Sequence, residues 1–164
     1  MNYVQALWRG VDRERPEDAA VIETSHPHFG RLVHFERFDG TGHWEAASSH
    51  PRTGARFTIV MPGDHDAPIQ PFANFHRQHV GHPDVFLRRC ADELRGAFER
   101  HTGRPLTAPC HEAFELEVLT LPVAARANGA GTASFHVAAI DTYFEVFFVG
   151  ERVKHGCAID LSAA

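Results

Sequence analysis

The spacing of apolar residues changes twice along this chain, and the change limits the folds that it can adopt. Residues 55–61 place apolar side chains at every second position, which is typical of a strand with one buried face. Residues 70–102 place them three and four positions apart, which is typical of helices, and residues 112–160 return to alternation. This order predicts an α+β fold, in which an antiparallel sheet (strands, then two helices, then strands) has its helices packed on one face.

The 164 residues are enough for one domain with a sizeable core. We expect a single domain over 1–164, with an N-terminal helix or arm at 1–18, strands at 20–62, two helices at 70–102 and strands at 112–160.

The middle of the sequence carries signals for the start and the end of helices. Pro71 suits the first turn of one helix, and the Gly81 region ends it. Asp84 can cap a second helix, and Gly103 is placed to stop it. We therefore predict the second helix over residues 84–102.

Charge and cysteine content exclude several classes of function. The formal net charge is −5, and acidic residues surround the adjacent Arg88 and Arg89, so we expect no nucleic-acid partner. The three cysteines, Cys90, Cys110 and Cys157, are odd in number and widely spaced, which favours a reducing cytoplasm over a disulfide framework. There is no run of 18 apolar residues and no signal-peptide pattern, so we expect no membrane partner.

Thirteen histidines raise the question of a metal site. His76, His79 and His82 follow one another at intervals of three, and on a helix the first two share a face and could chelate zinc. The same three residues also suit a solvated helix end, because no carboxylate lies among them. His26 and His28 would point the same way on an extended chain, which makes them a two-ligand fragment.

Two cysteines lie close to a histidine in the sequence. His155 and Cys157 share a strand face and form another two-ligand fragment, whereas a structural zinc normally takes four ligands. Cys110 and His111 could form a nucleophile and base only across a turn, since neighbours on an extended chain point to opposite faces.

Acidic residues follow two of the expected strands. Glu115 and Glu117 share a face about 7 Å apart by strand geometry. Asp141 and Glu145 lie on a strand that could be adjacent. These four carboxylates fit a solvated sheet face, a docking site for a basic partner, or an acid/base pair in a cleft.

The N-terminal segment has an apolar face. Val4, Leu7, Trp8 and Val11 are three and four residues apart, as on one side of a short helix. Such a helix would cover the core or contact a partner through Leu7 and Trp8.

Short motifs resemble a group of small, uncharacterised bacterial α+β domains. They are Phe-Gly-Arg-Leu at 29–32, Trp-Glu at 44–45, and the final hairpin of 144–148 and 153–160. The resemblance covers about residues 25–160. Some relatives of that group look like immunity proteins, which bind and neutralise a toxin from a neighbouring cell. The resemblance implies a fold and a binding role, and it implies no catalytic residues.

No complete catalytic motif or glycine-rich phosphate loop is present in the sequence. We therefore expect a non-catalytic module that binds a protein partner, one with a basic surface. The alternative is a metal-binding protein or a metal-dependent hydrolase that uses His76, His79 and His82.

Overall fold

The computed structural model describes residues 22–36 and 41–159. One sheet contains eight strands in sequence order. They are β1 (Ile22–His26), β2 (Gly30–Glu36), β3 (Gly42–Ser49), β4 (Arg56–Pro62), β5 (Glu115–Thr120), β6 (Ala130–Val137), β7 (Thr142–Val149) and β8 (Arg152–Ile159). Between β4 and β5 lie α2 (Gln70–Phe75), the π-turn η1 (His76–Val80), α3 (Pro83–Thr102) and α4 (Cys110–Ala113). The short turns η2 (Val123–Ala125) and η3 (Ala138–Ile140) follow.

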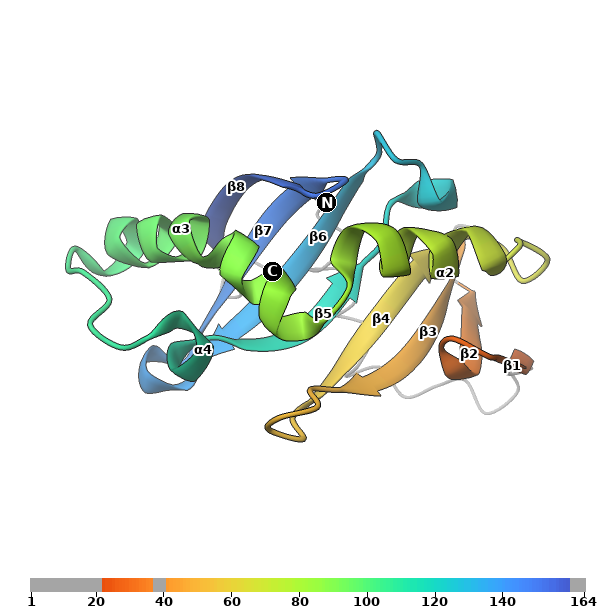
Figure 1. The fold of residues 1–164 in the computed structure, drawn as a ribbon, viewed down its shortest axis with the longest axis horizontal. Coiled ribbons are helices and arrows are strands. Elements are labelled where there is room, and N and C mark those ends of the chain that lie inside the picture. The colour runs from red at the N-terminus through yellow and green to blue at the C-terminus, as the bar shows by residue number, and fades with distance from the viewer. Residues whose placement is uncertain (1–21, 37–40, 160–164) are drawn as a thin grey trace.

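The sheet is mixed, so the predicted antiparallel sheet with two helices is wrong. Strands β4 and β5 pair in parallel, with Ile59 opposite Leu119, while every other neighbouring pair is antiparallel. Residues 63–114 pass over one face of the sheet and return the chain to the end at which β4 began (Figure 1). A crossover of this kind makes the next strand parallel. The connection also holds three α-helices and a π-turn instead of two helices.

Helix α3 confirms the helix expected over residues 84–102. Pro83 occupies its first turn, and Gly103 ends it in the left-handed conformation with φ 71°. The cap is His82 instead of Asp84, because the His82 side chain accepts a hydrogen bond from the Asp84 backbone N–H at 3.2 Å. The buried side of α3 consists of Phe86, Cys90, Leu94, Ala97 and Phe98.

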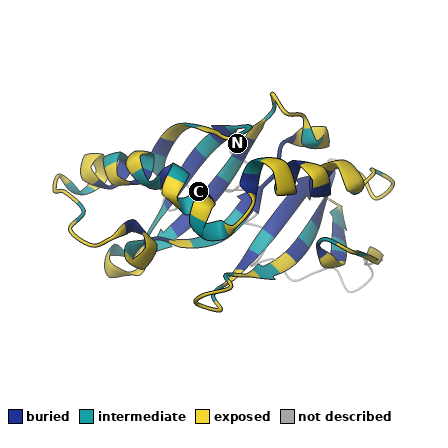
Figure 2. Cartoon of the chain, in the orientation of Figure 1, coloured by how far each residue is buried: buried dark blue, intermediate teal, exposed yellow. Residues whose placement is uncertain are grey.

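The core lies between the helices and the sheet face that they cover. Figure 2 shows buried residues on the strands behind the helices and on the helix sides that face them. The Phe86 ring of α3 meets the Phe148 ring of β7 edge to face, with centroids 5.3 Å apart. Gly156 of β8 lets α3 approach closely, since a Cβ there would lie 3.0 Å from the Glu93 carbonyl oxygen. Small and aromatic residues together therefore fix the distance between α3 and the sheet.

The opposite face of the sheet buries polar side chains. Along the strands, Leu119, Ala133 and Val146 belong to the core, and their neighbours Thr120, Ser134 and Glu145 point the other way. Thr120 is 6% exposed, and Ser134 and Glu145 are 0% exposed. None of the described helices combines the length and apolar content that a membrane span requires.

Candidate functional site

Three of the four acidic residues predicted as a partner surface gather around one histidine. His136 of β6 has its Nε2 3.0 Å from Asp141 Oδ1 and its Nδ1 4.0 Å from Glu117 Oε1. Glu115 is the cross-strand partner of His136. Tyr143 of β7 stacks on the imidazole, with centroids 4.6 Å apart and planes at 29°. We call these five residues the His136 cluster.

Local backbone features explain how the cluster forms. The pairing of β5 with β6 shifts register between Leu116 and Val118, and such a bulge re-aims a side chain, here that of Glu117. The turn η3 ends at Asp141 in the left-handed conformation with φ 47°, which returns this carboxylate to His136. His136 was missed by the sequence reasoning because neither the bulge nor the turn has a distinctive motif.

Burial, together with the charges of the cluster, shifts the pKa of two of its side chains. Burial raises the pKa of Glu117, the charge of His136 acts to lower it, and Glu115 raises it further. Burial also raises the pKa of Tyr143, and the Glu117 and Asp141 carboxylates add to that effect. The Asp141 side chain is 92% exposed, so the cluster presents negative charge directly to solvent.

The fourth predicted carboxylate lies elsewhere. Glu145 is fully buried on β7, opposite Ser134 on one side and Cys157 on the other, so its carboxylate is not at the surface. The other predicted contact residues, Leu7 and Trp8 in the N-terminal segment 1–18, lie outside the described residues.

The three histidines predicted as metal ligands have separate surroundings. His76 contacts His28, the His79 ring packs 4.6 Å from that of Phe75, and His82 caps α3. The turn η1 is wider than a turn of an α-helix, and a 2.8 Å hydrogen bond from the Gly81 N–H to the His76 carbonyl closes it. The prediction that His76 and His79 share a face depended on α-helical spacing, which is absent here. Within 22–36 and 41–159, no three His, Cys, Asp or Glu side chains are grouped to hold a metal ion.

The structure instead pairs His76 with the turn between β1 and β2. His28 Nε2 lies 3.0 Å from His76 Nδ1, and the Phe29 ring meets both imidazoles edge to face. Burial, followed by the charges of His28 and Arg77, lowers the pKa of His76 to about 4. This imidazole is therefore neutral at pH 7 and is held there by packing and by one hydrogen bond.

A groove of about 400 Å³ runs along α3 on the helix side of the molecule. Arg88 and Arg95 of α3, Arg52 of the β3–β4 loop and His111 of α4 line it, together with Asp84, Leu87, Ala91, Pro109 and Cys110. We call it the arginine groove.

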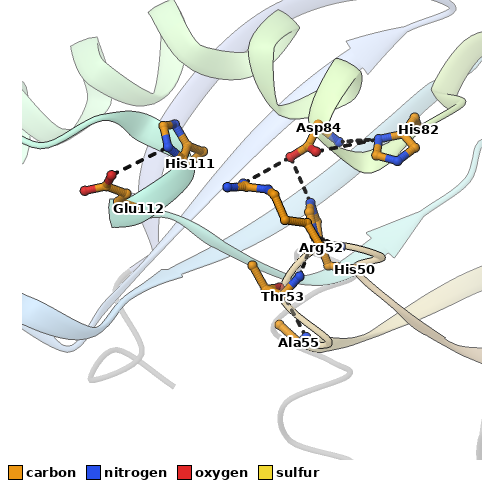
Figure 3. Close-up of polar contacts among 8 residues, drawn as sticks. All are labelled: His50, Arg52, Thr53, Ala55, His82, Asp84, His111 and Glu112. Atoms are coloured by element: carbon orange, nitrogen blue, oxygen red, sulfur yellow. Dashed lines mark hydrogen bonds and ion pairs between the residues drawn. The ribbon is translucent and has the colours of Figure 1, made fainter.

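Asp84 ties the β3–β4 loop to the start of α3. It accepts hydrogen bonds from His50 Nε2 at 3.0 Å and from Arg52 Nη2 at 3.3 Å (Figure 3). Desolvation acts to raise the pKa of Asp84, but the hydrogen bonds and charges of His50 and Arg52 lower it. The Asp84 carboxylate is thus paired within the protein by His50 and Arg52.

Cys110 and His111 do not form a nucleophile and base. The Cys110 thiol is buried and donates to the Ala91 carbonyl oxygen at 3.7 Å, and burial raises its pKa although Arg95 acts to lower it. His111 lies 3.6 Å from Glu112 instead (Figure 3). A protonated, buried thiol is a structural group, because only the thiolate is nucleophilic.

Comparison of the chain with protein-family models, with curated proteins and with solved structures finds no match.

Proposed function

We propose that this chain is a non-catalytic protein-binding module whose partner presents a basic surface. The observation that carries the proposal is the gathering of Glu115, Glu117 and Asp141 around His136 at one end of β5, β6 and β7. Carboxylates concentrated in this way attract a positively charged partner, speed its encounter and make binding sensitive to salt.

The exposure of Asp141 favours a binding role for this carboxylate over a catalytic one. An acid/base pair needs two groups in unequal, water-poor environments. Asp141 is 92% exposed, and this high-dielectric position suits a charge that steers a partner.

The resemblance to immunity-type domains adds a kind of partner to this proposal, namely a toxin from a neighbouring cell. A cytoplasmic location is part of the same proposal, and the three free cysteines support it.

The test compares partner capture by the wild-type chain and by a charge-reversed variant. Glu115→Lys combined with Asp141→Lys inverts the exposed charge of the cluster without touching the core. Glu151→Lys, at the exposed turn between β7 and β8, is the matched control. Each protein is cross-linked in extracts of the source cell and to any toxin encoded beside it, in purified form, and the products are quantified by mass spectrometry.

We expect wild type and Glu151→Lys to recover the same partner, and the double variant to recover at least tenfold less of it, as charge reversal at two contacts predicts. Equal recovery by all three proteins, or no specific partner for wild type, contradicts the proposal.

A further inference from the structure

The residues that line the arginine groove carry more positive than negative charge. Three arginines line it, Arg52, Arg88 and Arg95, and Asp84 is the one acidic residue among its lining residues. Arg88 makes no ion pair or hydrogen bond to any other residue in 22–36 or 41–159. Arg95 has a 3.8 Å contact to Asp92, a carboxylate that is 99% exposed, and it also lies close to the Cys110 thiol. Exposed ion pairs of this kind are weak.

The floor of the groove is less polar than its rim. Leu87 and Ala91 of α3 are partly buried hydrophobic residues packed against the core, and Cys110 beside them is buried. A ligand that fills this space therefore needs apolar atoms over the floor and negative charge at the rim.

The positions of the arginines decide which anion fits. Arg88 and Arg95 are seven residues apart on α3, which places their Cα atoms roughly 10 Å apart along the helix axis. A phosphate ion is best held by donors that converge on one point, whereas these cations are spread over two helical turns. Two separate carboxylates with an apolar side chain between them match the spread.

We propose that the arginine groove binds an acidic segment of a partner protein, in which carboxylates flank an apolar side chain. The site goes beyond the proposed function, since it lies on α3 and has the opposite charge to the His136 cluster. The acidic side chains pair with Arg88 and Arg95, and the apolar side chain covers Leu87 and Ala91. A nucleic acid would offer many charges too, but the net charge of −5 opposes it.

The test uses a fluorescein-labelled peptide of sequence Glu-Glu-Leu-Glu-Glu-Leu-Glu-Glu and an otherwise identical peptide with Gln in place of every Glu. Binding is followed by fluorescence anisotropy at low and at high salt, with inorganic phosphate as a competitor. The double variant Arg88→Glu, Arg95→Glu reverses the charge at these two positions of the groove. The double variant Arg88→Gln, Arg95→Gln removes that charge. The control is Arg104→Glu with Arg126→Glu, two exposed arginines outside the groove. Circular dichroism verifies that each variant is folded.

We expect the acidic peptide to bind wild type and the control with equal affinity, and salt to weaken both. Affinity should fall about tenfold or more on charge reversal, and less on neutralisation, as loss of two exposed ion pairs predicts. The proposal is overturned if the peptide does not bind wild type, if the Gln peptide binds as well, or if charge reversal leaves affinity unchanged. Displacement of the peptide by an equal concentration of phosphate would assign the groove to a small anion and would also overturn it.

Discussion

Replacement of His76 by Gln should make the stability of the fold less sensitive to acid. The fold lowers the pKa of His76 to about 4, whereas an unfolded histidine titrates near 6.5. The unfolded chain therefore binds this proton more tightly, so the stability that neutral His76 provides is complete above pH 6.5 and is lost as the pH falls toward 4. At pH 5 the loss is about 2 kcal/mol, since each pH unit below 6.5 costs about 1.4 kcal/mol until the folded group titrates.

The assay is chemical denaturation at pH 7 and pH 5 for wild type, His76→Gln and His111→Gln. The glutamine amide can accept a hydrogen bond from His28 or donate one to it, and it does not titrate. His111, whose side chain is 47% exposed, supplies the control. Other groups titrate in all three proteins, so the decisive quantity is the difference between their losses. We expect wild type and His111→Gln to lose about 2 kcal/mol more than His76→Gln between the two pH values. An equal loss in all three proteins would refute the reasoning.

Three further substitutions test the packing of α3 on the sheet, each by urea denaturation. Gly156→Ala should destabilise the fold by about 1–3 kcal/mol, because its new Cβ would lie 3.0 Å from the Glu93 backbone oxygen. Gly96→Ala, at a half-buried position of α3, is the contrast: its Cβ meets only the end of the Arg100 side chain, 3.1 Å from Nη1, and no backbone atom. The Arg100 guanidinium can shift while it keeps its hydrogen bond to the Gly156 carbonyl oxygen, so we expect a gain of about 0.5–1 kcal/mol. Phe148→Ala should cost about 3–5 kcal/mol, since the ring is 1% exposed in the core. If Gly156→Ala proves as stable as wild type, the close approach of α3 to β8 is wrong.

The local elements of this fold could be read from the sequence to a large extent. The helix expected over 84–102 is α3, and its end at Gly103 follows from the one residue type that adopts a positive φ easily. The alternation in 55–61 corresponds to β4, which ends with Pro62. Both predictions succeed because their causes are local. They are the spacing of the apolar residues and the glycine or proline that ends the helix or strand.

The pairing of the strands could not be read in this way. Alternation shows which side of a strand is buried and says nothing of the direction of its neighbour, so the parallel pairing of Ile59 with Leu119 was missed. The same limit applies to η1, because the composition of residues 76–80 does not distinguish a π-turn from an α-helix.

For the candidate sites too, the sequence predicted some of the residues and not others. Glu115, Glu117 and Asp141 were predicted as a surface because acidic residues stood out along the strands. Their partner His136 was not, since the contact depends on a bulge and on a turn. The arginine groove was missed entirely, because Arg52 is far in sequence from Arg88, and only the tertiary fold brings them to one groove.

The central claim, that the His136 cluster attracts a basic protein, is tested most directly by the rate of association. The partner identified by cross-linking is immobilised, and its association with wild type and with Glu115→Lys, Asp141→Lys is followed by interferometry over a range of salt concentrations. We predict that the wild-type association rate falls at least tenfold as salt rises and that the variant associates slowly at every concentration. A wild-type rate that does not change with salt, or a variant that associates as fast as wild type, would contradict the account.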